Sequence, residues 1–352
     1  MSISITEAAG AGFSGKTLKS SGLAPLRVAL VLVVALLLAG WVSAQHGPVV
    51  YAIIHEQDAL ALTDLFFEQT GLEVSLLRGS TGEIISRVIA EQNNPQADIV
   101  LGGPSTLHIV LEEAGAIEPY LAPALQNQPA GTFNPQGYWA GWHFTALGIG
   151  INTERFASRY GERPYPQTWE DLLDPAYAGE IVMTDPLASS TAYLFVQLQL
   201  QRLGWDAGWD YLARLAPLVA QFPSSGAAPA QLLGAGEYTL AVSYVHVLAR
   251  NISAGFPMAL VVPPDTTGEV GVVSIIRDGP NTEAAQQFVD FLLGAEAQQL
   301  FTDITLTSPV NPAVVLPAGA VSNESIQMID FDPQLSADQR DEVLQRWMEV
   351  VD

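Results

Sequence analysis

Segments rich in valine, isoleucine and leucine alternate with segments of helical apolar spacing along most of this 352-residue chain. Strand-like segments occur at 49–54, 72–77 and 97–101, and helix-like segments follow them at 58–70, 81–92 and 106–114. Such alternation is typical of α/β layers, in which helices cover both faces of a mostly parallel sheet. Because one core stops growing beyond about 250–300 residues, the length predicts two such sheets.

The N-terminus has the pattern of an export signal. Lys16, Lys19 and Arg27 precede an apolar run at 28–42, which is shorter than the roughly 20 residues needed to span a bilayer. The run ends in Val-Ser-Ala at 42–44, the small residues that a signal peptidase recognises. We therefore predict a signal peptide at 1–44, cleaved after Ala44, and an exported protein in the periplasm. An uncleaved membrane anchor is the alternative.

Composition excludes several classes of protein. Hydrophobic residues make up 49% and charged residues 14%, so the chain is not wholly disordered. The absence of cysteine removes disulfides, thiolate metal sites and cysteine nucleophiles. Acidic residues outnumber basic ones 37 to 14, a net charge of -23 that speaks against nucleic acid as a partner. Small anions remain compatible with this charge, because a local nest of backbone amides can hold an anion inside an acidic protein.

Three turns that open predicted helices, at 78–83, 186–191 and 223–227, are small and hydroxylated. Their candidate ligand-binding residues are Ser80, Thr81, Gly82, Ser189, Ser190, Thr191, Ser225 and Gly226. A helix start offers unpaired N–H groups and a partial positive charge, so hydroxyls beside it can complete a site for an anion. For each turn taken alone, an ordinary N-cap is the favoured interpretation, because Ser and Thr commonly cap helices. The three together predict a cleft lined from both domains.

Other candidates lie near the ends of further predicted strands. Gly103 and Ser105 belong to a turn in which glycine lets the backbone approach a ligand closely. His55 is either a metal or anion ligand or an exposed loop residue, and His143 and Tyr244 add imidazole and aromatic groups. His246 also lies near a predicted strand end, but packing in the core or at its rim is favoured for it over ligand binding.

Enzyme signatures are missing from the sequence. We find no G-x-S-x-G elbow, no G-x-x-x-x-G-K-[ST], no H-E-x-x-H and no G-x-G-x-x-G at a helix start. After residue 44 there is no lysine, which removes Schiff-base chemistry. The sequence therefore predicts binding rather than catalysis, with no catalytic residues.

Residues from about 49 to 312 resemble the periplasmic solute-binding proteins of ABC importers, in the branch of ferric-ion-binding proteins and their phosphonate- or sugar-phosphate-binding relatives. The resemblance depends on the order and spacing of several blocks, at 79–91, 94–100, 168–182, 185–193, 236–242 and 284–293. Two of them read Gly-Ser-Thr-Gly-Glu-Ile-Ile-Ser-Arg from Gly79 and Asp-Pro-Leu-Ala-Ser-Ser-Thr-Ala-Tyr from Asp185.

The resemblance implies a two-lobed type II periplasmic-binding fold, whose hinge-linked lobes each hold a mixed, mostly parallel sheet. Lobe one would comprise 47–146 with 259–306, and lobe two 150–255 with 310–352. The crossing segments would be 146–151 and 258–262.

Ferric-binding members of the family hold iron with a His after the first strand, a Glu after the third and two adjacent tyrosines. His55 matches the first ligand, but Gly103 stands where the Glu would be and Tyr244 has no tyrosine beside it. Fe(III) prefers anionic oxygen ligands, so these losses weaken an iron site. The hydroxyl turn Ser189, Ser190 and Thr191 matches the anion-binding side of the family.

The sequence thus predicts an extracytoplasmic receptor of an ABC importer that captures a small anionic solute, phosphate-bearing or phosphonate-like, between its lobes. The alternative is a ferric-ion receptor in which His55 and Tyr244 bind the metal together with an exogenous anion. An exported hydrolase and a sensory subunit are further hypotheses. We expect no cofactor, with ferric ion as cargo only under the alternative. The expected partners are an inner-membrane permease and its ATPase, and the receptor itself is expected to be a monomer.

Overall fold

A mixed β-sheet of 11 strands runs through residues 46–351, the part of the chain that the computed structural model describes. The predicted signal peptide at 1–44 lies outside these residues. Within 46–351, none of the helices combines the length and the apolar composition needed to cross a membrane.

The first half of the sheet has strand order β2-β1-β3-β10-β5. Its strands are β1 (Val49–Ala52), β2 (Ser75–Arg78), β3 (Ile99–Pro104), β4 (Ile117–Glu118), β10 (Gly268–Ile276) and the start of β5 (Ala140–Asn152). β1 pairs in parallel with β2 and β3, whereas β10 runs antiparallel to β3, β4 and β5. Parallel pairing is therefore confined to the strands that alternate with helices along the chain.

The second half is built on the other end of β5. Its further strands are β6 (Ile181–Val182), β7 (Val219–Gln221), β8 (Leu240–Tyr244) and β9 (Met258–Val261). β5 pairs antiparallel with β8 and β9, and β6 pairs in parallel with β7 and β8. The sequence predicts two separate sheets, but β5 spans 13 residues and joins both halves into one.

The return crossing lies later in the chain than expected. The predicted boundary at 258/259 falls at the start of β9, and β9 pairs with β5 residues Ile149 to Asn152 in the second half. β10 then begins at Gly268 in the first half. Residues 262–267 therefore connect the halves in the structure.

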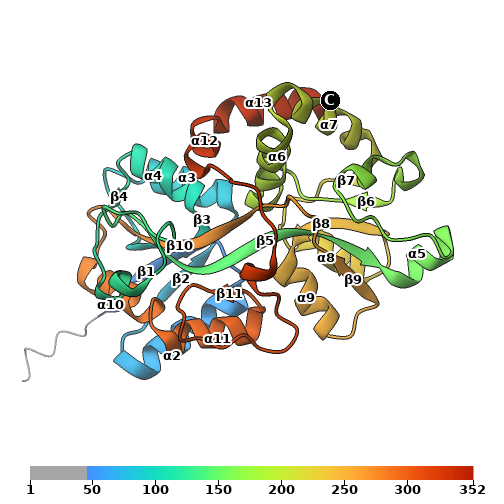
Figure 1. Cartoon of the computed structure of the whole chain (residues 1–352). Helices are drawn as coiled ribbons and strands as arrows, with labels where there is room; N and C mark the ends of the chain where they lie inside the picture. Colours follow the sequence, from blue (N-terminus) through green and yellow to red (C-terminus); the bar gives the residue numbers. More distant parts are fainter. Residues whose placement is uncertain (1–45, 352) are drawn as a thin grey trace, which may run out of the picture. The chain divides into compact units, whose positions relative to one another are not determined.

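Helices cover both faces of the sheet (Figure 1). Those of the first half are α2 (Glu56–Thr70), α3 (Thr81–Ala90), α4 (Ser105–Glu113), α10 (Thr282–Leu292) and α11 (Ala295–Thr305). Those of the second half are α5 (Thr153–Tyr160), α6 (Ser190–Leu203), α7 (Trp205–Leu215), α8 (Ala228–Gly234) and α9 (Val245–Ser253). This arrangement confirms the α/β class. We call each half of the sheet with its helices a lobe.

Each lobe has apolar cores of its own. In the first lobe, Leu62 and Phe66 of α2 pack with Trp142 of β5 and Phe288 of α10. In the second lobe, a large cluster surrounds the fully buried Trp169, and a smaller one contains Leu248 of α9. Burial of this apolar surface stabilises each lobe on both faces of its sheet.

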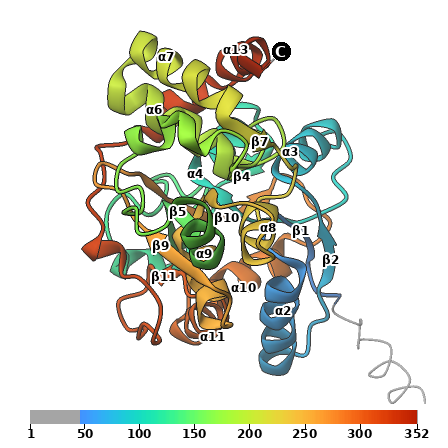
Figure 2. The same cartoon turned by 90° about the vertical axis from the view of Figure 1, so that its right-hand side faces the viewer.

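The C-terminal segment passes between the lobes. β11 (Ser308–Pro309) pairs with β5 at Phe144 and His143, and the Ile329 N–H donates to the Thr266 carbonyl at 2.9 Å. The two last helices are α12 (Pro333–Asp338), which packs on α4, and α13 (Arg340–Val351), which packs on α7. Figure 2 shows α13 beside α7, far from α2. Trp347 of α13 is buried in the main core of the second lobe.

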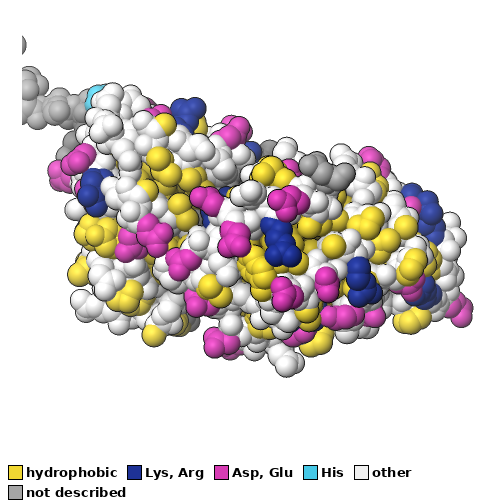
Figure 3. Space-filling view, turned by 90° about the horizontal axis from the view of Figure 1, so that it is seen from above, with side chains coloured by type: hydrophobic (Ala, Val, Ile, Leu, Met, Phe, Trp, Pro, Cys, Tyr) yellow, Lys and Arg dark blue, Asp and Glu magenta, His cyan; other side chains and the backbone are white. Residues whose placement is uncertain are grey.

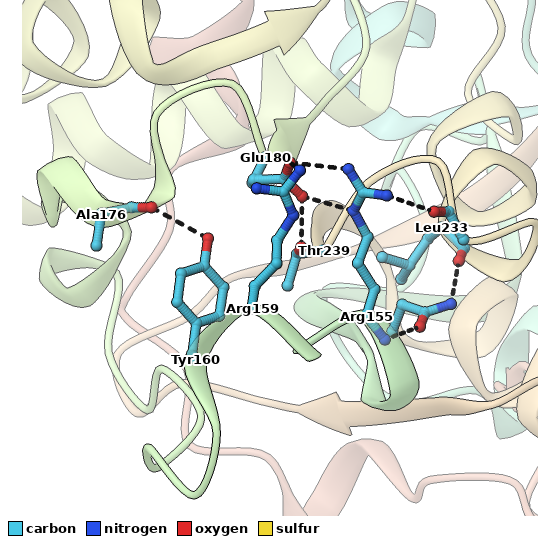
Figure 4. A network of polar contacts seen from close by, with 9 residues as sticks. Arg155, Arg159, Tyr160, Ala176, Glu180, Leu233 and Thr239 are labelled. Atoms are coloured by element: carbon cyan, nitrogen blue, oxygen red, sulfur yellow. Dashed lines mark hydrogen bonds and ion pairs between the residues drawn. The ribbon is translucent and has the colours of Figure 1, made fainter. Parts of the chain in front are cut away.

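A buried ionic network joins α5 to β6 and β8 in the second lobe (Figure 4). Glu180 is 4% exposed and lies 2.7 Å from Arg155 Nε and 2.7 Å from Arg159 Nη2. The Thr239 hydroxyl also donates to this carboxylate, and Arg155 Nη1 donates to the Gly236 carbonyl at 2.9 Å. The network fixes the start of α5 against the edge of the sheet.

Glu180→Gln is expected to lower the free energy of unfolding by about 2 kcal/mol at neutral pH, because two arginines lose the carboxylate that faces them. Burial alone would raise the pKa of Glu180, but bonds from Arg155 and Thr239 and the two guanidinium charges outweigh it and hold the pKa below its usual value. This contribution is therefore present above the usual pKa of 4.5 and is lost as the pH falls through the lower pKa of the folded protein. Urea unfolding of both proteins across this range measures the difference. An unchanged difference in acid would contradict the assignment.

Candidate ligand-binding site

A cavity of about 460 Å³ lies where the two lobes meet, and both lobes contribute to its walls. All the predicted site residues except Gly82 and Ser105 line it: His55, Ser80, Thr81, Gly103, His143, Ser189, Ser190, Thr191, Ser225, Gly226 and Tyr244. Ser105 is the buried first residue of α4. Gly82 lies at the lobe boundary, because a Cβ there would be 3.5 Å from the Leu187 carbonyl oxygen. Residues far apart in sequence thus meet at one cavity.

The turn before α3 forms one wall. Ser80 is the N-cap of α3: its hydroxyl accepts from the Glu83 N–H at 3.4 Å, and its own N–H donates to Glu83 Oε2 at 2.7 Å. This reciprocal capping box uses the Ser80 hydroxyl for the helix, as the N-cap alternative predicted. Thr81, which is 5% exposed, and Arg78 at the end of β2 also line the cavity. Arg78 was not among the predicted site residues, because a single arginine at a strand end carries no distinctive signal.

The turn before α6 forms the facing wall. Ser189 is the N-cap of α6, but its side chain makes no capping hydrogen bond. Ser189 and Thr191 are 7% and 4% exposed and line the cavity. The two turns meet directly at the lobe boundary, where the Thr81 hydroxyl donates to Ser190 Oγ at 3.5 Å. In contrast to Ser80, the Ser189 hydroxyl is free of the helix and available to a ligand.

The third turn adjoins the second. A Cβ added to Gly226 would lie 3.3 Å from both Ser189 Oγ and Thr191 Oγ1, so a larger residue there would crowd these hydroxyls. Ser225 lines the same cavity. We call this set of hydroxyls, Thr81, Ser189, Ser190, Thr191 and Ser225, the cradle. With Arg78 and the N-terminus of α6 beside it, the cradle offers donors and positive potential to an anion.

A carboxyl–phenol pair adjoins the cradle, since the Tyr244 hydroxyl lies within hydrogen-bond reach of Ser190 and Thr191. The Tyr244 hydroxyl, at the end of β8, donates to Glu269 Oε1 on β10 at 2.6 Å, so the pair joins the two lobes. Burial raises the pKa of Glu269 to about 8, which makes it a neutral acid at pH 7. Burial and the neighbouring Glu269 raise the pKa of Tyr244 well above its usual value. Glu269 was missed because a single glutamate at a strand start carries no distinctive sequence signal.

Two neutral imidazoles complete this region. His143 is 6% exposed and packs against Trp142 and Phe301, with ring centroids 4.3 and 5.0 Å away. Gly271 makes room for it, since a Cβ there would lie 2.0 Å from His143 Cε1. Burial lowers the pKa of His143 and of His246 to about 3. The His246 ring stacks on the Tyr244 ring, with centroids 5.5 Å apart, and it also lines the cavity. His246 therefore has the predicted packing contact and faces the cavity as well.

His55 lies at the start of α2 and lines the cavity beside Asp58. Desolvation by the surrounding residues lowers the pKa of His55 below its usual value, although the side chain is exposed at the surface. Gly103 has φ 83°, and a Cβ there would meet Leu107 Cδ2 at 2.8 Å and Ile53 Cδ1 at 3.0 Å. A side chain at this position would therefore strain the backbone and displace the ends of Leu107 and Ile53. Within residues 46–351, no three His, Asp or Glu side chains are grouped as metal ligands.

The chain as a whole is acidic, with a net charge of -23. Asp and Glu side chains are spread over the face shown in Figure 3, with fewer Lys and Arg among them. An anion is therefore attracted by the local donors of the cradle rather than by the general charge of the surface.

Comparison with known proteins agrees with this architecture. The family model of bacterial extracellular solute-binding proteins matches residues 94–334, and the chain belongs to this family. The chain is similar to the periplasmic binding protein AfuA from Actinobacillus pleuropneumoniae with exogenous fructose-6-phosphate bound, at 28% identity and a TM-score of 0.84, covering 87% of this chain and 99% of that one. It is 25% identical to the "Probable ABC transporter periplasmic-binding protein y4fP" of Sinorhizobium fredii, over 75% of this chain and 74% of that protein.

A ferric binding protein from Campylobacter jejuni has the same fold, with a TM-score of 0.75 at 19% identity over 86% of this chain and 98% of that one. These likenesses confirm the predicted two-lobed type II fold and the predicted family.

Proposed function

We propose that this protein is the periplasmic receptor of an ABC importer for a small organic solute that carries a phosphate or phosphonate group. The observation that carries the proposal is the cradle, in which hydroxyls from both lobes converge beside Arg78 and the N-terminus of α6. Charge-assisted hydrogen bonds to such an anion are stronger than neutral ones. The similarity to a protein seen with fructose-6-phosphate supports this ligand class.

Beyond its anionic group, the ligand would face Glu269, Tyr244 and His143, which line the same cavity next to the cradle. At pH 7 these three groups are uncharged, since Glu269 has a pKa of about 8 and His143 of about 3. Neutral donors and acceptors suit hydroxyl and carbonyl groups. We therefore favour a phosphorylated, hydroxylated carbon skeleton over inorganic phosphate.

The receptor would act as a monomer without a cofactor, release its cargo to an inner-membrane permease with its ATPase, and catalyse no reaction. Family membership and the similarity to an ABC transporter binding protein support the roles in solute capture and delivery to a permease. Cleavage after Ala44 would place the mature protein in the periplasm.

Calorimetric titration of the purified protein with three probes tests the ligand class. Fructose 6-phosphate is expected to bind most tightly, inorganic phosphate more weakly, and fructose without phosphate weakest of all, because only the first engages both ends of the cavity. Native mass spectrometry of freshly isolated protein should show a co-purifying phosphorus-containing compound. Binding of fructose as tight as that of its phosphate would overturn the proposal, and release of inorganic phosphate during titration would indicate a hydrolase.

Ferric ion is the second candidate, because His55 and Tyr244 line one cavity. Gly103 supplies no carboxylate where ferric-binding relatives have one, and burial and Glu269 oppose ionisation of Tyr244. Titration with ferric citrate is therefore expected to give no tyrosinate–iron absorption band in the visible. A strong band that disappears in Tyr244→Phe would favour the ferric receptor instead.

A further inference from the structure

A second cavity of about 500 Å³ adjoins the ligand cavity on its α2 and α9 side. The two cavities share wall residues, among them His55, Asp58 and Val247. Arg250 lines only the outer cavity, together with the polar Gln57, Gln231 and Asn251. The boundary between the two cavities therefore passes through the place where Asp58 meets Arg250.

Asp58 and Arg250 form an ion pair across the lobes. Arg250 Nη1 lies 3.0 Å from Asp58 Oδ1 and 3.1 Å from Oδ2, and the Asp58 side chain is only 6% exposed. Asp58 is on α2 of the first lobe and Arg250 on α9 of the second; in Figure 1 both helices lie below the sheet, under different halves. Among the ion pairs within residues 46–351, this is the one that joins a helix of one lobe to a helix of the other.

Neither helix depends on the pair for its own folding. α2 is held to the first lobe by Ala59, Leu62 and Phe66, all fully buried. α9 is held to the second lobe by Leu248. Asp58 also lies in the first turn of α2, where the helix dipole favours a carboxylate without any arginine. The ion pair therefore stabilises the contact between the two lobes and not the fold of either lobe.

We propose that the Asp58–Arg250 pair is a latch that stabilises the closed cleft and separates the ligand cavity from the outer one. The proposal rests on the proposed function, since a latch matters for a receptor that opens and closes on a ligand. When the lobes open about β5 and residues 262–267, α2 moves with the first lobe and α9 with the second. Opening therefore separates Asp58 from Arg250. Apparent affinity falls as the closed fraction falls, so Arg250 affects affinity although it does not line the ligand cavity.

The first test uses the ligand-free protein. Arg250→Met removes the charge while keeping an unbranched side chain, and Asp58→Asn removes the partner. In small-angle scattering, both variants are expected to show a larger radius of gyration than the unaltered protein. The charge-exchanged variant, Asp58→Arg with Arg250→Asp, is expected to have a radius of gyration closer to that of the unaltered protein. Asp174→Asn is the matched control, because it breaks an ion pair with Arg163 inside the second lobe.

The second test is affinity for fructose 6-phosphate. Arg250→Met is expected to bind about tenfold more weakly, mainly through faster dissociation, and the charge-exchanged variant to recover most of this loss. Arg250 does not line the ligand cavity, so its effect cannot come from a lost ligand contact. Asp174→Asn should bind like the unaltered protein, and circular dichroism should show all variants folded.

Unchanged scattering and unchanged affinity in folded Arg250→Met would overturn the latch. The latch would also be overturned if the charge-exchanged variant restored neither the radius of gyration nor the affinity for fructose 6-phosphate. If the unaltered protein binds none of the phosphate probes, the proposed ligand class fails, and the ligand-free scattering still decides whether the pair holds the lobes together.

Discussion

Ser189→Ala is expected to weaken binding of fructose 6-phosphate by about tenfold to hundredfold, which corresponds to one lost hydrogen bond to a charged group. Ser189 is buried at the N-terminus of α6, lines the ligand cavity, and makes no capping bond that the substitution would remove. The free energy of unfolding should therefore change by less than about 1 kcal/mol. Calorimetric titration and urea unfolding of the same preparation measure the two effects.

Ser80→Ala is the matched control, because Ser80 occupies the same N-cap position on α3 but uses its hydroxyl in a capping box. For this variant the order should reverse: stability falls by about 1 kcal/mol, whereas affinity changes little. Equal affinity for all three proteins would leave the cradle without a role in binding. A large loss of stability in Ser189→Ala would make that serine a structural cap instead.

Raising the pH from about 5 to 9 is expected to destabilise the protein through Glu269, and Glu269→Gln should remove this part of the pH dependence. The folded protein holds the proton up to a pKa of about 8, whereas the unfolded chain releases it near 4.5. Between these values the folded state binds more protons, so its stability falls as the pH rises, by at most about 1.4 kcal/mol per pH unit. Above pH 8 the new carboxylate in the cavity should also weaken anion binding.

Urea unfolding of both proteins at several pH values measures the effect, with Glu68→Gln, at an exposed position on α2, as control. The difference in stability between Glu269→Gln and the unaltered protein should grow steadily with pH, while the control difference stays flat. A constant difference for Glu269→Gln would mean that its carboxyl group ionises normally in the cavity.

Local features of this fold are predictable from the sequence. Gly71 follows the predicted helix at 58–70 and is the C-cap of α2, and the Ser-Thr-Gly-Glu turn is the capping box of α3. Both depend on residues within a few positions of one another, which single-sequence patterns capture. The hydroxyl turns converge because helix starts lie at the carboxyl ends of parallel strands.

Contacts across the lobes are not predictable in this way. Asp58 and Arg250 are 192 residues apart, and Tyr244 and Glu269 lie on different strands 25 residues apart. Which side chains meet depends on the register of β5 with β8 and β10, and a shift of one residue would turn every side chain to the other face. For the same reason, the full length of β5 and its membership of both sheets were not visible in the apolar pattern of 145–152.

The shared strand β5 also determines how this chain reaches its native state. Neither lobe is a continuous stretch of sequence, and each needs β5 as an inner strand of its own half-sheet. A fragment cut on either side of β5 would leave a half-sheet with an open edge and an uncovered core. The two lobes are therefore expected to fold as one cooperative unit, and the long-range pairing of β5 with β8 and β10 slows that folding.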